Sequence, residues 1–246
     1  MDAVHFIARK LRGLARVIEK PELLKIRRQG VFLDVYEQLN LAWIKEKNIS
    51  TLLDIGASVG DFALAAHAVF PNARIYAFEP LPDHFEILQK RLAATPGFQA
   101  FNVALGEQTG TTTFERSDCS NSSSILKMSA AHRAAFPETG KSQTTEVKIE
   151  TLDNMAKKME IRDPMLIKID VQGYEDHVLK GGRQTLQRAE VIIVETSLEI
   201  LYEGQPLFDD IFTLLKSWGF KYAGMFDQML HPQSNRVLQV DAIFVR

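Results

Sequence analysis

The stretch Leu52-Leu53-Asp54-Ile55-Gly56-Ala57-Ser58-Val59-Gly60-Asp61 decides the fold of this chain. An apolar run over residues 51–55 leads into two glycines, and a helical pattern follows over residues 61–70. Glycine lets the backbone adopt unusual dihedral angles where a strand turns sharply into a helix. Short apolar runs then alternate with helical segments, which is typical of parallel βαβ construction. The pattern predicts a doubly wound α/β domain.

The remaining elements follow from the same periodicities. Core strands are expected over 51–55, 74–78, 98–103, 165–170 and 191–195, and a closing pair over 220–225 and 240–245. Helices are expected over 61–70, 83–94, 177–188 and 208–218, and further strands over 111–115 and 146–150. Residues 1–50 show only helical periodicity, with one helix expected over 31–47. We therefore expect an N-terminal helical extension (1–50) followed by one domain (51–246).

The bulk composition excludes several classes of protein. Hydrophobic residues make up 46% and charged residues 24%, as in soluble globular proteins. A formal net charge of −2 gives no electrostatic case for a nucleic-acid partner. The one cysteine, Cys119, allows no intramolecular disulfide, so we expect a reducing, cytoplasmic location. No apolar stretch approaches the ~20 residues of a membrane span, and early charges argue against a signal peptide.

The spacing of the glycine turn indicates the kind of ligand. It reads Gly-x-x-x-Gly, and so lacks the Gly-x-Gly-x-x-Gly of pyrophosphate-binding folds and the Gly-Lys-Ser/Thr of a triphosphate loop. A carboxylate at Asp54 suits an amino-acid or sulfonium ligand better than a phosphate. In a doubly wound sheet this turn borders the crevice where ligands bind. The alternative is that the glycines only make a tight turn.

An acidic residue, Glu79, ends the second expected strand, in Ile75-Tyr76-Ala77-Phe78-Glu79-Pro80. Such a side chain can accept two hydrogen bonds from a ribose diol. Glu79 therefore indicates an adenosine-containing ligand, without separating a methyl donor from a nicotinamide. The alternative is an exposed charge before a proline turn.

The third constellation is Leu166-Ile167-Lys168-Ile169-Asp170-Val171-Gln172-Gly173-Tyr174-Glu175. Its strand carries Asp170 to the same edge of the sheet. Asp170 is our candidate catalytic residue, able to orient the ligands or draw a proton from a hydroxyl, with helix capping as the alternative. Glu195 ends the next strand and is either site wall or structural acid. The isolated histidines 84, 177 and 231 are expected on the surface. No cluster has metal-ligand spacing, so no metal is expected, the alternative being a divalent ion shared by Asp170 and Glu195.

A long polar insertion runs from Arg116 to Gln143 and contains the serines Ser122, Ser123 and Ser124. Loops this long in compact domains are commonly functional lids or disordered segments. Because the insertion lies between core strands, we expect a lid over the acceptor, with a short helix over residues 130–136.

These motifs, taken in order, resemble the FkbM-type methyltransferase family over roughly residues 30–246. The similarity extends through Asn102-Val103-Ala104-Leu105-Gly106, Thr151-Leu152-Asp153, Val178-Leu179-Lys180-Gly181-Gly182, Val194-Glu195 and Leu201-Tyr202-Glu203-Gly204-Gln205. The resemblance implies the class I methyltransferase fold, a mostly parallel seven-stranded sheet with a reversed last strand. It also implies S-adenosylmethionine as donor and O-methylation of a small molecule or sugar.

Carried over by residue, the resemblance places the methionine portion of the donor at Asp54, Gly56 and Gly60, the ribose at Glu79 and the adenine near Asn102 to Leu105. The cofactor-binding residues expected are Asp54, Gly56, Ala57, Ser58, Gly60, Glu79, Pro80, Asn102, Ala104, Leu105 and Asp170. Gln172, Glu195 and the three serines are expected on the acceptor or lid side. Two positions depart from many members: Ser58 stands in place of asparagine and Gln172 in place of glutamate.

Two other classes remain open at this point. A nicotinamide oxidoreductase would share the sheet and Glu79 but needs the pyrophosphate glycine pattern and a Tyr-x-x-x-Lys pair, neither of which is evident. A non-catalytic donor-binding module would keep the fold, although the intact acids argue against it. The N-terminal helices could cap the site or form a homodimer contact, and the sequence decides neither.

Overall fold

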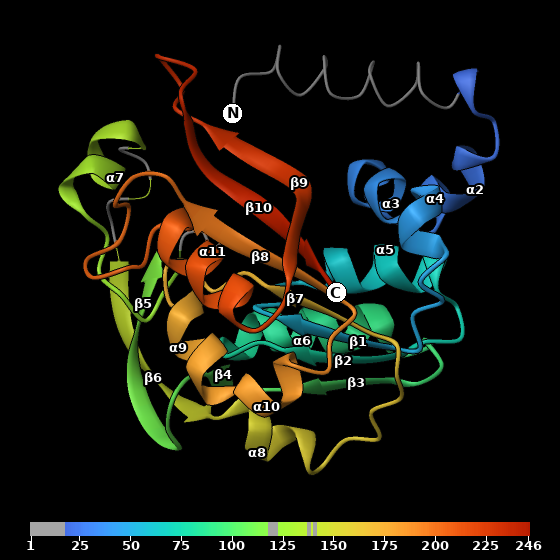
Figure 1. Cartoon of the computed structure of the whole chain (residues 1–246), viewed down its shortest axis with the longest axis horizontal. Coiled ribbons are helices and arrows are strands. Elements are labelled where there is room, and N and C mark those ends of the chain that lie inside the picture. The colour runs from blue at the N-terminus through green and yellow to red at the C-terminus, as the bar shows by residue number, and fades with distance from the viewer. Residues whose placement is uncertain (1–17, 118–122, 137–138, 140–141) are drawn as a thin grey trace.

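A seven-stranded sheet forms the centre of the computed structural model, which describes residues 18–117, 123–136, 139 and 142–246 (Figure 1). Its order is β3-β2-β1-β7-β8-β10-β9. The strands are β1 (Thr51–Ile55), β2 (Arg74–Phe78), β3 (Phe98–Phe101), β7 (Met165–Ile169), β8 (Val191–Ser197), β9 (Lys221–Leu230) and β10 (Val237–Val245). Only β10 runs antiparallel to its neighbours, β8 and β9; the other pairs are parallel. The expected doubly wound sheet with a reversed last strand is confirmed.

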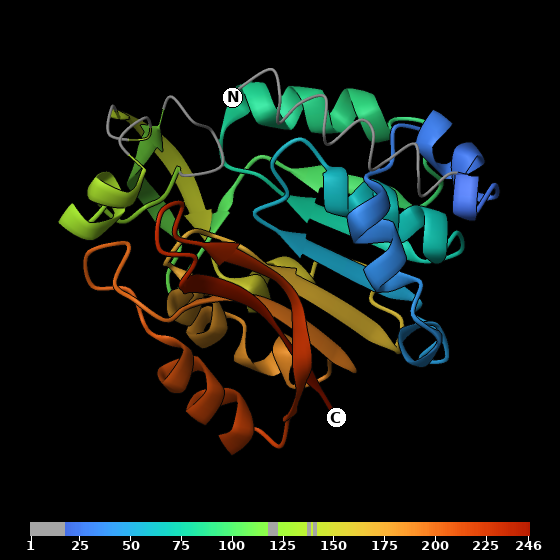
Figure 2. The ribbon, with the colours of Figure 1, turned by 90° about the horizontal axis from the view of Figure 1, so that it is seen from above.

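Helices cover both faces of this sheet (Figures 1 and 2). One layer contains α3 (Leu33–Leu39), α4 (Ala42–Lys45), α5 (Asp61–Val69) and α6 (Pro82–Leu92). The other contains α8 (Leu152–Ala156), α9 (Glu175–Gly181), α10 (Arg183–Leu186) and α11 (Phe208–Ser217). Every residue of β1 and β7 is buried, as in parallel strands covered on both faces. This explains why these strands read as nearly continuous apolar runs, each with one charged residue, Asp54 in β1 and Lys168 in β7.

The N-terminal helices pack into the same core. α2 (Leu23–Arg28) begins two residues after Pro21, and α3 packs against α5. The expectation of one helix over 31–47 is wrong, because Leu41 takes an extended conformation (φ −57°, ψ 138°) and separates α3 from α4. Leu39 and Ile44 are fully buried in the core that α5 shares with the sheet.

The strands that flank the polar insertion form a second, three-stranded sheet of order β4-β6-β5. Its strands are β4 (Ala104–Leu105), β5 (Gly110–Ser117) and β6 (Ser142–Glu150), so β5 and β6 extend beyond the expected limits. The expected short helix is present as α7 (Ala130–Ala135), where the Ser129 side chain accepts a hydrogen bond from the His132 N–H. Among the described residues, no helix is long and apolar enough to cross a membrane.

The helix expected over 177–188 is instead two helices, α9 and α10, which meet at Gly182. The chain comes very close to a neighbouring turn here. A Cβ atom on Gly181 would lie 1.9 Å from the carbonyl oxygen of Gly106. The glycine pair therefore serves close packing between α9 and the segment after β4.

Candidate active site

A cavity of about 670 Å³ opens at the carboxyl ends of β1, β2, β7 and β8. The strand order reverses between β1 and β7, and in α/β sheets ligands bind at such a switch point. Its volume is typical of sites for small molecules and cofactors. Of the expected site residues, the cavity is lined by Asp54, Gly56, Ala57, Ser58, Glu79, Pro80, Ala104, Leu105, Ser123, Asp170, Gln172 and Glu195.

Three expected residues lie elsewhere, and a fourth is not described. Gly60 does not line the cavity; a Cβ atom there would meet the side chains of Leu88 and Leu92 on α6. Asn102 lies outside the lining and donates to the carbonyl oxygens of Glu79 and Pro80, each at 2.9 Å. Ser124 is buried behind the cavity wall, and Ser122 falls outside the described residues. Gly60, Asn102 and Ser124 thus shape the site from behind.

The glycine turn lets two strand ends meet. Gly56 has φ +81°, and a Cβ atom on it would lie 1.8 Å from the carbonyl oxygen of Asp170. The Asp170 N–H donates to the Ile55 carbonyl at 2.9 Å. No side chain could be accommodated between these segments, so a glycine at this position brings Asp54 and Asp170 to one cavity.

Asp54 is a fully buried carboxylate without a hydrogen bond to the described residues. Burial raises its pKa to about 6, although the Lys168 ammonium and the nearby Ala63 N–H oppose the shift. A buried polar group without a partner is costly, and in native proteins it calls for an explanation. A cationic ligand group in the cavity would supply the missing partner.

Glu79 is held by the backbone on both of its oxygens. The Ser58 N–H donates to Oε2 at 2.9 Å and the Leu81 N–H donates to Oε1 at 2.8 Å. Burial raises the pKa of Glu79 to about 7, against these two hydrogen bonds. A carboxylate has about four acceptor positions, so two remain for the hydroxyls of a ribose.

A hydrogen-bonded network joins the two acids at the ends of β7 and β8. Lys168 Nζ donates to Asp170 Oδ2 at 2.8 Å, and Gln172 Nε2 donates to Asp170 Oδ1 at 2.9 Å. The same amide nitrogen lies 3.0 and 2.9 Å from the two carboxylate oxygens of Glu195. The Tyr202 hydroxyl donates to Gln172 Oε1 at 2.8 Å. One glutamine side chain therefore lies between both acids.

The two acids differ electrostatically. Burial opposes the charged form of Asp170, but the Lys168 ammonium and the Gln172 amide outweigh it and lower the pKa of Asp170. Burial raises the pKa of Glu195 well above its ordinary value, and the carboxylates of Asp170, Glu175 and Asp241 raise it further. Lys168 itself has a raised pKa: burial would lower it, but the surrounding acids prevail.

Sequence reasoning missed several residues of the site. His84, expected on the surface, is 8% exposed, with Nδ1 3.3 Å from Ser58 Oγ. Asp227 and Asp241 reach the cavity from β9 and β10. Lys168 was visible as the one charged residue of an apolar strand, whereas no local signal marks the other three.

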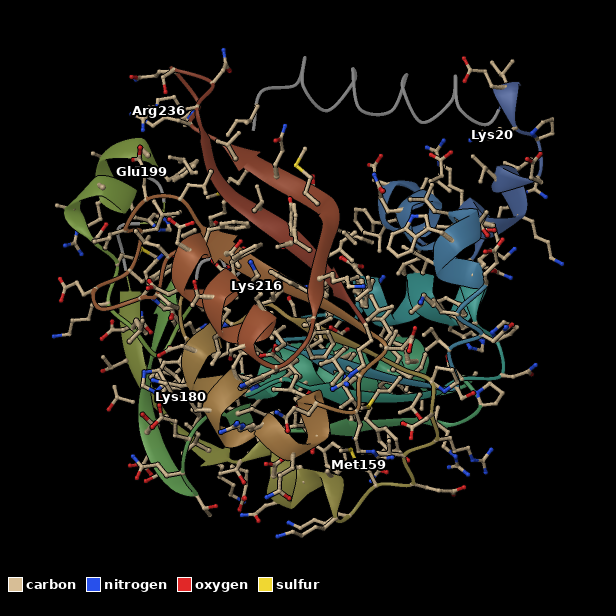
Figure 3. The ribbon with its side chains drawn as sticks, viewed as in Figure 1. Lys20, Met159, Lys180, Glu199, Lys216 and Arg236 are labelled. Carbon is tan, nitrogen blue, oxygen red and sulfur yellow. The ribbon has the colours of Figure 1, made fainter. Side chains whose placement is uncertain are left out.

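An ion pair between Arg236 and Glu199 joins the β9–β10 hairpin to the segment after β8 (Figure 3).

Residues 54–222 match the Methyltransferase FkbM domain family. The chain belongs to this family. It is 29% identical over 219 residues to the 2-O-methyltransferase NoeI of Sinorhizobium fredii, covering 86% of each protein. It is 30% identical over 145 residues to the hexuronic acid methyltransferase AglP of Haloferax volcanii, covering 58% of this chain and 54% of AglP.

A solved structure supports the fold. The methyltransferase FkbM of Methylobacillus flagellatus KT superposes with a TM-score of 0.50 at 14% identity, over 85% of this chain and 48% of that one. The family match favours a methyltransferase over a nicotinamide oxidoreductase, and the chain is a methyltransferase that uses S-adenosylmethionine as its donor.

The cavity fits this donor. The unpartnered carboxylate of Asp54 would hold the cationic methionine portion, and Glu79 would hold the ribose. Ala104 and Leu105 line the cavity and would provide an apolar wall for the adenine. When bound, the donor supplies a methyl group already activated by a sulfonium.

Proposed function

We propose that this FkbM-family enzyme methylates a hydroxyl oxygen of an uncharged sugar. The name of NoeI specifies methyl transfer to an oxygen, and the name of AglP specifies a hexuronic acid, a sugar acid, as acceptor. The charge of the cavity wall favours neutral acceptors over acidic ones.

The charged side chains that line the cavity are almost all acidic. The described lining contains seven acidic residues, one lysine and no arginine; the acids are Asp54, Asp61, Glu79, Asp170, Glu195, Asp227 and Asp241. The lysine, Lys168, is already paired with Asp170. Asp61 is paired with Arg91 and the pKa of Glu195 is raised, so Asp227 and Asp241 supply the negative charge that a carboxylate or phosphate on the acceptor would meet. Such a like-charge contact costs several kcal/mol across a binding surface. Sugar hydroxyls instead find hydrogen-bond acceptors here.

The chain's own contribution to the reaction is chiefly one of position. Holding the acceptor oxygen in line with the methyl carbon can lower the barrier by ~7–11 kcal/mol. Asp170, fixed by Lys168 and Gln172, can accept a hydrogen bond from an acceptor hydroxyl without being displaced. Asp227 and Asp241, on the last two strands, can bind further hydroxyls.

The proposal is tested with a matched pair of acceptors, methyl glucoside and methyl glucuronide, which differ in one carboxylate. We expect methylation of the glucoside, with kcat/KM for the glucuronide lower by about 10²-fold because of like-charge repulsion. Asp227→Asn and Asp241→Asn should reduce the difference in kcat/KM between the two acceptors. An enzyme that methylates the glucuronide as fast as the glucoside contradicts the proposal.

A further inference from the structure

Two acids lie at the cavity where an acceptor hydroxyl would lose its proton, and one of them is already occupied. Both oxygens of Asp170 accept a hydrogen bond, one from the Lys168 ammonium at 2.8 Å and one from the Gln172 amide at 2.9 Å. The ion pair keeps Asp170 charged and makes it a weak proton acceptor. Asp170 is thus suited to orienting a hydroxyl and poorly suited to deprotonating it.

Glu195 has the opposite surroundings. No cation of the described chain lies within ion-pair distance of it, and its one hydrogen-bond donor there is the amide nitrogen of Gln172. Four charged groups face it from three elements: Lys168 and Asp170 at β7, Glu175 on α9 and Asp241 on β10, directly across the strand pair. Three of the four are acids, so a proton on Glu195 relieves like-charge repulsion.

We propose that Glu195 is the catalytic base of this methyltransferase, a role that rests on the hydroxyl acceptor proposed above. As the acceptor oxygen bonds to the methyl carbon, the hydroxyl proton passes to a Glu195 carboxylate oxygen. The carbon–sulfur bond breaks and its electron pair stays on sulfur. A carboxylate and a sulfonium thus become a carboxylic acid and a thioether, and the acceptor becomes an ether.

Gln172 is the positioning residue for this base. The Tyr202 hydroxyl donates to its amide oxygen, which turns the amide nitrogen toward the two acids. Its backbone is left-handed, with φ +57°, and its carbonyl accepts a 2.6 Å hydrogen bond from Ser124 Oγ. A non-glycine residue in this conformation is held there by its surroundings, commonly at a functional site. Tyr202 and Ser124 supply those restraints.

The environment of Asp170 lowers its pKa, whereas the environment of Glu195 raises the pKa of that carboxyl. Such a divergence between neighbouring titratable groups is how acid–base roles are assigned in many enzymes. A base with a raised pKa also takes a hydroxyl proton more readily than an ordinary carboxylate does. The rate should therefore rise with pH as Glu195 loses its resting proton.

The experiment combines kinetics, donor-site binding and infrared titration of wild type, Glu195→Gln and Asp170→Asn. Glu195→Gln should lower kcat by about 10²–10⁴-fold and abolish the ascending limb of the pH profile. Its affinity for S-adenosylhomocysteine should stay within about twofold of wild type, since general-base catalysis is separate from donor binding. The infrared spectrum of the free protein should contain a carboxylic acid band that is absent in Glu195→Gln. That band should titrate at the midpoint of the ascending limb.

Two variants test the assignment without removing Glu195. Asp241→Asn removes a facing negative charge, so the midpoint should move to lower pH. Gln172→Glu places a third carboxylate between the two acids, so the midpoint should move to higher pH. Unchanged midpoints in both variants, or wild-type kcat in Glu195→Gln, would overturn the proposal.

These measurements also distinguish a failure of the base assignment for Glu195 from a failure of the acceptor proposal. If no glycoside is methylated by wild type, the acceptor proposal fails. The infrared titration then still decides on Glu195, because a band with the midpoint of an ordinary glutamate contradicts the base assignment.

Discussion

Asp54 illustrates how a single residue can favour ligand binding at the expense of stability. Its carboxylate is fully buried without a hydrogen bond to the described chain, and its pKa is raised to about 6. Above that pH the folded protein must hold a buried charge that the unfolded chain would expose to water. The donor's cationic portion would repay this cost only when it is bound.

Asp54→Asn should therefore raise the free energy of unfolding of the ligand-free protein by about 1–2 kcal/mol at pH 8. The gain should disappear at pH 4 and below, where Asp54 is protonated in the wild-type fold and becomes protonated in the unfolded chain as well. The same variant should bind S-adenosylhomocysteine more weakly. Urea denaturation at both pH values and calorimetric titration measure the two effects. A loss of stability at pH 8 would mean that Asp54 is a paired structural acid.

At the scale of elements, the junction of α9 with α10 matters because it packs closely against the segment after β4. Gly181 lies in α9, where alanine would by helix propensity be favoured by about 1 kcal/mol. A Cβ atom there would instead lie 1.9 Å from the Gly106 carbonyl oxygen and 3.2 Å from Glu107 Cα. Backbone atoms cannot rotate away, so packing opposes propensity at this position.

Gly181→Ala should lower the free energy of unfolding by about 2 kcal/mol, in the range of overpacked substitutions. Gln184→Ala is the matched control on α10, an exposed position that should change stability by less than about 0.5 kcal/mol. Thermal or urea denaturation distinguishes them. A stabilised Gly181→Ala would show that the two segments separate readily.

For the whole molecule, the buried acids set how stability depends on pH. Burial raises the pKa of Glu175 to about 8, and Asp54, Glu79 and Asp241 are raised to between about 6 and 7. Each raised acid holds a proton that the unfolded chain releases, so its stabilisation is complete below about pH 4 and is lost as pH rises through the folded pKa. His67 and His84 act oppositely, but only below about pH 6.5, because burial lowers their pKa.

The unfolding free energy should consequently fall by about 2 kcal/mol between pH 6.5 and 8, with Glu175 as the main contributor. Glu175→Gln should flatten this slope, since a glutamine oxygen can still accept from the Val171 and Gly173 N–H groups. Denaturation curves at three pH values are sufficient. Stability that rises over this interval would contradict the burial of these acids.

Much of the fold could be predicted from the sequence because its signals are local. The limits of β1 and β2 agree with the expected ranges, since a buried parallel strand reads as a nearly continuous apolar run. The division of residues 31–47 and 177–188 into two helices each could not be predicted. Those breaks depend on an extended residue at Leu41 and on close packing at Gly181, which are tertiary features.

By itself the sequence determined that a parallel sheet carries Asp54, Glu79, Asp170 and Glu195 to one edge, because strand periodicity and the glycine turn are encoded by neighbouring residues. Only the tertiary structure decided what each acid can do there. Gln172 donates hydrogen bonds to both Asp170 and Glu195, and Glu195 lies 23 residues further along the chain. Asp241 faces Glu195 from another strand. Since a pKa depends on distances between charges and on burial, the division between an orienting acid and a proton-accepting acid arises only when the chain is folded.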